Sequence, residues 1–337
     1  MTRPVPAWRM APLAALLLAA SAGRVPAAPA VPSASVAPWA PAAISSDQFE
    51  SHAAFDRRAD ALYFVRSKPD FSGWRILASH CGAHGWETPV RPAFAGAGLE
   101  ADPWLTPDGE TLYFISTRAS GSRASKDLDI WTATRNGEAG WDAPTRLPAP
   151  VNSDDAEWFP RLARDGWLYF GSRRPGGAGG NDIWRARKDA DGAWRVENAG
   201  RGINTSGDEY EALPSPDGRT LLLMASGGLY RAHWQGGTWI GRGKLPPPVT
   251  VNGSEIGAVF SPSGNSVLFS RDTGSGRSGE FFLWRLAGEE AWPPACPAPP
   301  RKRAAGSPAP AGLAAAQSGI SGSTSFPSST SDCCHPR

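Results

Sequence analysis

The sequence predicts an all-β protein, namely a β-propeller built from four-stranded blades. The composition is rich in turn-forming residues, with Gly 38 and Pro 33 among 337 residues, and poor in helix-favouring runs. A stretch of about fifty residues recurs along the chain, and each copy contains four short strand patterns. Because a period near fifty with strand patterning is typical of propellers, these observations together predict the fold.

Each repeat begins with a glutamate, an inner strand, a tight turn and a second, apolar-aromatic strand. The clearest copy is EADPWLTPDGETLYFISTR at 100–118. The others are ESHAAFDRRADALYFVR (50–66), EWFPRLARDGWLYFGSRR (157–174), EYEALPSPDGRTLLLMAS (209–226) and EIGAVFSPSGNSVLFSR (255–271). In the Pro-Asp-Gly turns, proline presets φ and glycine supplies a positive φ, so the two strands are expected to form a hairpin.

Two further strands complete each repeat. The third is apolar-aromatic: WRILAS (74–79), DIWTATR (129–135), DIWRARK (182–188), GLYRAHW (228–234) and FFLWRLA (281–287). We expect its aromatic residue to occupy one repeat position, filled by Trp74, Trp131, Trp184, Tyr230 and Trp284, and to pack one blade on the next. The fourth strand is expected to start at a tryptophan: Trp86, Trp141, Trp194, Trp239 and Trp292.

The segments outside the repeats have a different composition. Residues 1–22 have the basic start, the short apolar run and the small-residue cleavage site of a signal peptide. We expect a Pro/Ala linker at 23–44, the propeller at 45–296 and a disordered Pro/Ala/Ser-rich tail at 297–337. No cysteine directly follows the apolar run, so no lipid anchor is expected. After cleavage the chain is expected to be periplasmic or secreted, without a transmembrane segment; the alternative is that the apolar run remains as an uncleaved N-terminal anchor, although it is shorter than the ~20 residues a span needs.

The run EWFPRLARDGWLYFGSRRPGGAGGNDIW (157–184), like DPWLTPDGETLYFISTR followed by DIW, resembles the TolB-type (WD-like) propeller repeat of exported bacterial proteins. The resemblance covers 45–296 and implies a propeller, often six-bladed, that acts as a protein-binding platform in the periplasm. TolB proteins carry an α/β domain before the propeller, where this chain has only the expected linker. The five visible repeats predict either a five-bladed ring or six blades with one degenerate or shared.

Several motifs are weaker than they look. The sequence GSGRSG (274–279) lies between two expected strands, whereas a dinucleotide-binding loop needs a following helix. His80, Cys81 and His84 have no second ligand pair at metal-binding spacing. The net charge of +2 indicates no affinity for nucleic acid. We therefore predict no cofactor, no metal and no catalytic set.

The leading glutamates are the candidate partner-binding residues. In a ring they would form a circle at the channel mouth that attracts cationic groups, together with other carboxylates; the full set is Glu50, Glu100, Asp102, Glu157, Asp208, Glu209, Glu211 and Glu255. The alternative is that the leading glutamates pair with arginines that follow the second strand: Arg66, Arg118, Arg173 and Arg271. The fourth repeat lacks this arginine, so we expect Glu209 to be the unpaired carboxylate.

Two function classes fit this pattern. The first is an exported binding or scaffold module whose partner is an envelope protein or a cell-wall-associated molecule. The second is a glycan-acting hydrolase or lyase, which would need carboxylates that break the repeat, such as Asp102 and Glu211, to converge within about 5–10 Å. We expect binding rather than catalysis, because the repeats account for most chemically suited residues.

The cysteines allow a further expectation. Cys81 lies in the first repeat and Cys296 at the end of the last, so ring closure would make their blades neighbours. An exported chain meets an oxidising compartment, where these residues could form a disulfide. Cys333 and Cys334 could compete for the same partners.

Overall fold

The structure is a computed structural model that describes residues 35–57, 60–121, 127–137, 140–274, 279–286, 288 and 291–296. The expected signal peptide at 1–22 and the expected tail at 297–337 lie outside these residues. The described part of the chain contains strands and no helix. It therefore also contains no helix that is long and apolar enough to cross a membrane.

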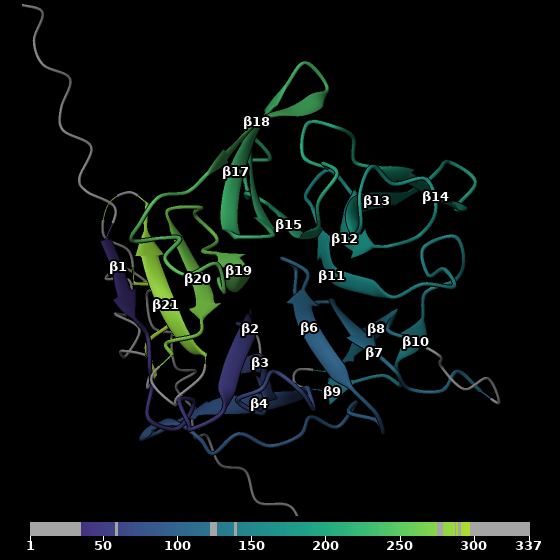
Figure 1. The fold of residues 1–337 in the computed structure, drawn as a ribbon. Coiled ribbons are helices and arrows are strands. Elements are labelled where there is room, and N and C mark those ends of the chain that lie inside the picture. Colours follow the sequence, from purple (N-terminus) through teal and green to yellow (C-terminus); the bar gives the residue numbers. More distant parts are fainter. Residues whose placement is uncertain are drawn as a thin grey trace, which may run out of the picture. The chain divides into compact units, whose positions relative to one another are not determined.

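Five antiparallel sheets lie around a common centre as the blades of a propeller (Figure 1). Blade 1 contains β2 (Phe49–Asp56), β3 (Ala61–Ser67), β4 (Arg75–Gly82) and β5 (Gly85–Trp86). Blade 2 contains β6 (Glu100–Leu105), β7 (Thr111–Ser116), β8 (Asp129–Asn136) and β10 (Thr145–Arg146), with β9 (Gly140–Trp141) also paired to β8. Blade 3 contains β11 (Glu157–Leu162), β12 (Leu168–Ser172), β13 (Asp182–Lys188) and β14 (Trp194–Asn198).

Blade 4 contains β15 (Glu209–Pro214), β16 (Thr220–Ala225), β17 (Gly228–Gln235) and β18 (Thr238–Lys244). Blade 5 contains β19 (Ile256–Phe260), β20 (Ser266–Arg271), β21 (Glu280–Arg285) and β1 (Ser35–Pro38). The inner strand of each blade contacts that of the next, and β19 contacts β2, so the ring is closed. The predicted propeller is confirmed, and it has five blades.

The outer strand of blade 5 comes from the start of the described chain. β1 runs antiparallel to β21, with Ser35 opposite Arg285 and Pro38 opposite Phe282. Residues 35–38 were expected to belong to the linker, so the structure corrects that boundary. Trp292, which was expected to begin this strand, lies outside any strand and packs against Phe55. Because β1 precedes blade 1 in the sequence but pairs with β21 of blade 5, the first and last strands of the propeller lie in one sheet.

The strand register also corrects the expected tryptophan position. Trp131, Trp184 and Tyr230 are equivalent, because they stand opposite Phe114, Phe170 and Leu223 in the second strands. The same position is filled by Leu77 in blade 1 and Phe282 in blade 5. Trp74 lies before β4 and Trp284 lies two residues after Phe282, so neither holds the repeat position that was expected for it.

The tight turns explain why the inner and second strands pair. In blade 2, Gly109 has a φ of 74° and donates its N–H to the Thr106 carbonyl at 2.8 Å. The Asp108 carboxylate accepts hydrogen bonds from the Thr106 hydroxyl at 2.6 Å and the Glu110 N–H at 3.0 Å. The turn therefore satisfies its own polar groups, as this residue pattern predicts.

Apolar side chains fill the space between neighbouring blades. Leu112, Phe114, Ile130 and Phe170 belong to one buried cluster that spans blades 1 to 3. Phe269 belongs to another, between blades 4 and 5. The second and third strands supply most of these residues, which leaves the starts of the inner strands and the loops beside them to form the channel mouth.

Candidate functional site

The five leading glutamates are completely buried. Each accepts a backbone hydrogen bond from the loop four residues earlier in the chain; the donors are Ser46, Gly96, Ser153, Thr205 and Val251. Each also pairs with an arginine: Glu50 with Arg66 (2.7 Å), Glu100 with Arg118, Glu157 with Arg174 (2.7 Å), Glu209 with Arg242 (2.8 Å) and Glu255 with Arg271 (3.0 Å). Burial raises the pKa of Glu50 and Glu157, although hydrogen bonds and the arginines oppose it.

Two of these pairs differ from those expected. Glu157 takes Arg174 rather than its neighbour Arg173. Glu209 is not unpaired, because Arg242 reaches it from β18, the outer strand of the same blade. The repeat position after the second strand does not predict this arginine, because Arg242 comes from a different strand of the blade.

Four of these arginines lie over aromatic rings of the third strands, and Arg66 lies over Phe64 of the second strand, 5.4 Å from the ring centre. The guanidinium carbon is 5.4 Å from the ring centre for Arg118 over Trp131, 5.5 Å for Arg174 over Trp184, 4.4 Å for Arg242 over Tyr230 and 4.7 Å for Arg271 over Phe282. The charges are thus neutralised and covered inside each blade. This geometry matches the alternative in which each leading glutamate pairs with an arginine, rather than an open circle of carboxylates that attracts a partner.

A second circle lies two residues further along each inner strand, at His52, Asp102, Phe159, Glu211 and Gly257. Most of these residues have a positive φ, and each lies at or beside an interruption of the strand register. The Asp102 carboxylate accepts the Phe159 N–H at 3.0 Å, and the Glu211 carboxylate accepts the Gly257 N–H at 3.0 Å. Each carboxylate therefore caps the irregular backbone of the following blade.

Arg161 links the two carboxylates of this circle. Its guanidinium donates to Glu211 at 2.6 and 3.0 Å, and its charge also acts on Asp102. Burial, with a smaller contribution from Glu211, nevertheless raises the pKa of Asp102 to about 7. Burial and the Arg161 charge lower the pKa of His52, whose Nε2 lies 3.4 Å from Asp102 Oδ1.

This inner layer is closed to solvent. Asp102, Arg161 and Glu211 are each at most 2 % exposed. A glycan-cleaving pair must contact the sugar on both sides of the bond, and buried groups held by backbone N–H donors and an arginine do not offer such contact. The layer is better explained as a polar plug of the channel.

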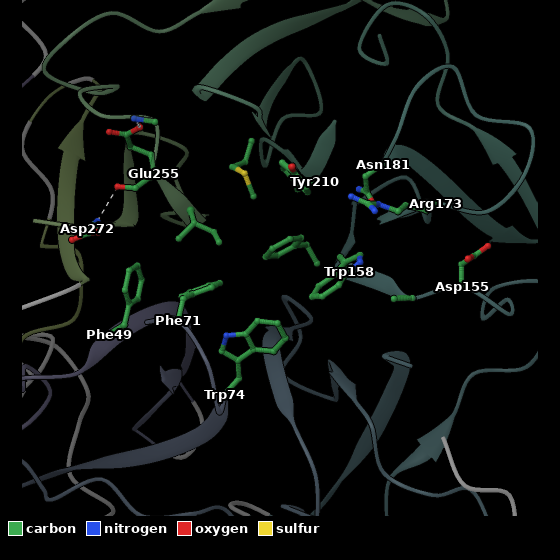
Figure 2. Close-up of a pocket in the computed structure, with 16 residues that line it drawn as sticks. Phe49, Phe71, Trp74, Asp155, Trp158, Arg173, Asn181, Tyr210, Glu255 and Asp272 are labelled. Carbon is green, nitrogen blue, oxygen red and sulfur yellow. Dashed lines mark hydrogen bonds between the residues drawn. The ribbon is translucent and has the colours of Figure 1, made fainter. Parts of the chain in front are cut away.

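Above the plug, the channel mouth opens into a cavity of about 830 Å³ (Figure 2). Aromatic rings form a continuous series along one wall, and each pair meets edge to face. The ring centres are 4.9 Å apart for Phe49 and Phe71, 5.6 Å for Phe71 and Trp74, and 5.7 Å for Trp74 and Trp158. Tyr210, Met224 and Ile256 extend the apolar lining from blades 4 and 5.

Polar groups lie at both ends of the cavity. Figure 2 shows Glu255 and Asp272 on the same side as Phe49, and Arg173 and Asp155 on the opposite side. The Arg173 side chain is 67 % exposed and lies 3.7 Å from Asp208. Of the predicted partner-binding residues, Glu255 therefore lines the cavity, and Asp208 touches a residue of its lining.

The floor of the cavity rests on the plug. Phe159 lines the cavity, and its ring stacks on His52 with centres 5.1 Å apart. A much smaller void of about 20 Å³ is bounded by His52, Asp102, Trp74 and Trp158, among others. The mouth cavity and the buried titratable groups are thus separated by single aromatic side chains.

The repeat pattern does not predict the aromatic wall. Phe71 has no equivalent in the other repeats, and Trp74 does not hold the repeat position expected for it. A usable signal was present: aromatic residues stand directly beside the leading glutamate in only three repeats, at Phe49, Trp158 and Tyr210. Residues that depart from a repeat are the ones that its structural role does not explain.

Cys81 and Cys296 are joined in a disulfide, the pairing that the sequence suggested. The bond connects the outer edge of blade 1 with the segment that follows blade 5. Among the described residues there is no group of three His, Cys, Asp or Glu side chains that could hold a metal ion.

No family model and no curated protein matches the chain. Among solved structures, it is similar to a gluconolactonase from Xanthomonas campestris (13 % identity, 76 % of this chain and 91 % of that chain, TM-score 0.43). It is also similar to a glucose dehydrogenase (12 %, 76 % and 100 %, 0.41) and to a PQQ-bound aldose sugar dehydrogenase from Streptomyces coelicolor (10 %, 75 % and 98 %, 0.39). At these identities and TM-scores the similarities carry no inference about this chain, and the TolB-type resemblance stays a prediction.

Proposed function

We propose that the protein is an exported binding propeller whose mouth cavity receives a group presented by its partner. The observation that carries this proposal is the cavity of about 830 Å³ lined by aromatic rings from different blades. Ligand sites in proteins are typically concave, mostly apolar and about 300–1,000 Å³ in volume, with a few polar groups that orient the ligand. The cavity has this size and this composition.

Binding is better supported than the alternative, a glycan-acting hydrolase or lyase. The carboxylates that break the repeat, Asp102 and Glu211, lie beneath the floor and are engaged by Arg161 and by backbone N–H groups. The leading glutamates are held by arginines. Carboxylates that are engaged in this way contribute to stability. The residues of the cavity wall are then the ones that contact a ligand.

We place the protein in the periplasm or outside the cell, with an envelope protein or a cell-wall-associated molecule as its partner. The disulfide between Cys81 and Cys296 supports this location, because such bonds persist in oxidising compartments and are rare in the cytosol.

Site-specific photo-crosslinking in cells tests the proposal. A photoreactive residue at Asp155, in the cavity lining, should capture a partner, whereas one at Thr238, in the outer strand of blade 4, should not. Capture at 155 should be lost in a Trp74→Ala background whose melting temperature is close to that of the parent. Equal capture from both positions, or capture that survives Trp74→Ala, would show that the cavity is not the binding site.

A further inference from the structure

We infer that the mouth cavity binds the unbranched alkyl chain of a single-chain lipid, whose polar head stays at the open side of the cavity. This inference rests on the proposed function, namely that the cavity binds a ligand. It adds the chemical class of the group that is bound.

The first argument is the composition of the wall. The charged residues of the lining lie at its two ends, and Figure 2 shows aromatic residues between them. The apolar side chains of the lining come from blades 1, 3, 4 and 5 and include Phe71, Trp74, Trp158, Tyr210, Met224 and Ile256. Burial of apolar surface is favourable in proportion to the area removed from water. An elongated apolar group that contacts several blades therefore gains more than a compact group that contacts one.

The second argument is that polar groups of the wall are already engaged by the protein itself. Asn181 is 1 % exposed, and its amide donates to the Glu209 carbonyl. The Ser254 hydroxyl donates to the Asn252 side chain at 2.6 Å and accepts a backbone N–H at 3.0 Å. The Glu255 carboxylate is held by its arginine and by backbone N–H groups. These groups do not replace the water that the hydroxyls of a sugar would lose on entering the cavity, whereas an alkyl chain has no such hydroxyls.

The third argument is the shape of the aromatic series. The ring planes meet at 68° for Phe49 and Phe71, 62° for Phe71 and Trp74, and 79° for Trp74 and Trp158. Neighbouring rings therefore offer faces in different directions. A planar ring can lie flat on only one of these faces, whereas a flexible chain bends at each corner and contacts several. Met224 adds a flexible side chain that adapts to irregular apolar shapes.

Calorimetric titration of the full-length protein tests the inference through chain length. The probes are hexanoate, octanoate and decanoate, each kept below the concentration at which it forms micelles. We expect the affinity to rise about fourfold for each added methylene, because this is the ratio that burial of one methylene produces. Octyltrimethylammonium and octyl-β-glucoside should bind within about tenfold of octanoate, because the chain and not the head carries the contact. Glucose and N-acetyl-tryptophanamide, which lack the chain, should bind at least tenfold more weakly than octanoate.

Variants locate the bound chain. Phe71→Ser should weaken decanoate binding at least tenfold, because it removes apolar surface from the wall. Phe71→Leu and Trp74→Leu keep apolar side chains and should weaken binding less than threefold, which separates apolar contact from a requirement for a ring. Trp234→Ser is the matched control: Trp234 is 38 % exposed in β17 and is not part of the cavity lining, so binding should not change.

The inference fails if affinity does not rise with chain length, if one charged head binds and the other does not, or if glucose or N-acetyl-tryptophanamide binds as tightly as octanoate. It also fails if Phe71→Ser binds decanoate normally while retaining the parental melting temperature. The crosslinking experiment in cells uses none of these probes, so the proposed binding function can stand when the ligand class does not.

Discussion

The leading glutamate of each blade illustrates how a charged residue comes to be fully buried. Its carboxylate is held by backbone donors on one side and by an arginine on the other, and in all five blades that arginine also lies over an aromatic ring. Burying a charge is expensive unless it is paired and hydrogen-bonded. The arrangement meets both conditions, which explains why a glutamate is found here in every blade.

The fourth blade tests this explanation. Because Arg242 pairs with Glu209 as Arg174 pairs with Glu157, Glu209→Gln and Glu157→Gln should lower the free energy of unfolding by similar amounts, about 2–3 kcal/mol each. Urea denaturation measures both. Glu197→Gln is the control, because its side chain is 51 % exposed and its pair with Arg185 should contribute less than about 1 kcal/mol. A much smaller cost at Glu209 would mean that Arg242 does not hold it.

Asp102 should make stability depend on pH. Its pKa is raised from 3.8 to about 7 in the folded protein, so between these values the folded state holds a proton that the unfolded state has lost. Raising the pH from about 4 to about 7 therefore favours unfolding through this group. His52 acts in the opposite direction, because its lowered pKa keeps it neutral in the fold while the unfolded state takes up a proton below about pH 6.5.

Comparison with Asp102→Asn isolates the Asp102 contribution. Across that pH range, the unfolding free energy of the parent should fall relative to that of the variant by up to about 4 kcal/mol. Denaturant titrations at several pH values give the difference directly. Parallel pH profiles for the two proteins would contradict the raised pKa.

At the scale of the secondary-structure element, irregular strands determine where the site lies. Each inner strand departs from regular pairing near its start, and His52, Asp102 and Phe159 adopt φ values between 51° and 57° there. Such irregularities re-aim side chains. Here they bring polar groups together beneath Phe159 and place the neighbouring Trp158 in the cavity wall.

Gly257 shows how closely these strands approach. A Cβ atom at this position would lie 2.7 Å from the backbone nitrogen of His52, and its φ of 66° also favours glycine. The irregular segment of blade 5 therefore packs directly on that of blade 1, where the ring closes.

The short strand β1 should contribute measurably to stability. Pro38 has no N–H to donate, so it fits a β-strand only where its nitrogen points away from the neighbouring strand. The Trp39 N–H donates to the Phe281 carbonyl at 2.8 Å. Because N–H groups alternate in direction along a strand, the Ala37 N–H also points toward β21. Ala37→Pro removes this donor and should lower the free energy of unfolding by about 1–3 kcal/mol. Ala37→Ser keeps the donor at an exposed position and should cost less than about 0.5 kcal/mol.

Thermal melting of the two variants decides the point. If Ala37→Pro melts at the same temperature as Ala37→Ser, β1 does not close blade 5 in solution.

For the whole molecule, closure is secured at more than one place. β1 joins the start of the described chain to blade 5, and the disulfide ties the segment after blade 5 to blade 1. In a ring whose blades contact only their neighbours, the junction between the last and the first blade is the place where opening begins. The two connections hold that junction.

Removal of the disulfide should therefore have a large effect. The bond joins residues 215 apart in sequence, and cross-linking such a long loop restricts the unfolded chain, which corresponds to up to about 5 kcal/mol. Cys81→Ser/Cys296→Ser should melt at a lower temperature than the parent. A reducing agent should lower the melting temperature of the parent and leave the double variant unchanged; an effect on both, or on neither, would contradict the assigned bond.

The sequence by itself determined the features that lie within one repeat. The hairpin turns, the strand order in a blade, the number of units and the leading glutamates are all encoded over about fifty consecutive residues, where local turn chemistry and strand patterning act. Ring closure, which the repeats already implied, suggested the Cys81–Cys296 pair, and the structure decided it against the competing Cys333 and Cys334. The features within one repeat needed no knowledge of which blades face each other.

Only the tertiary structure decided the features that combine distant segments. Arg242 pairs with Glu209 from a different strand of the same blade. The strand β1, at residues 35–38, completes blade 5, whose other strands lie at residues 256–285. Arg161 of blade 3 pairs with Glu211 of blade 4. The mouth cavity gathers its lining from residues 49 to 272. A repeat pattern describes what the blades share, whereas a site at the centre of the ring is built from the side chains in which they differ, and these meet only when the ring closes.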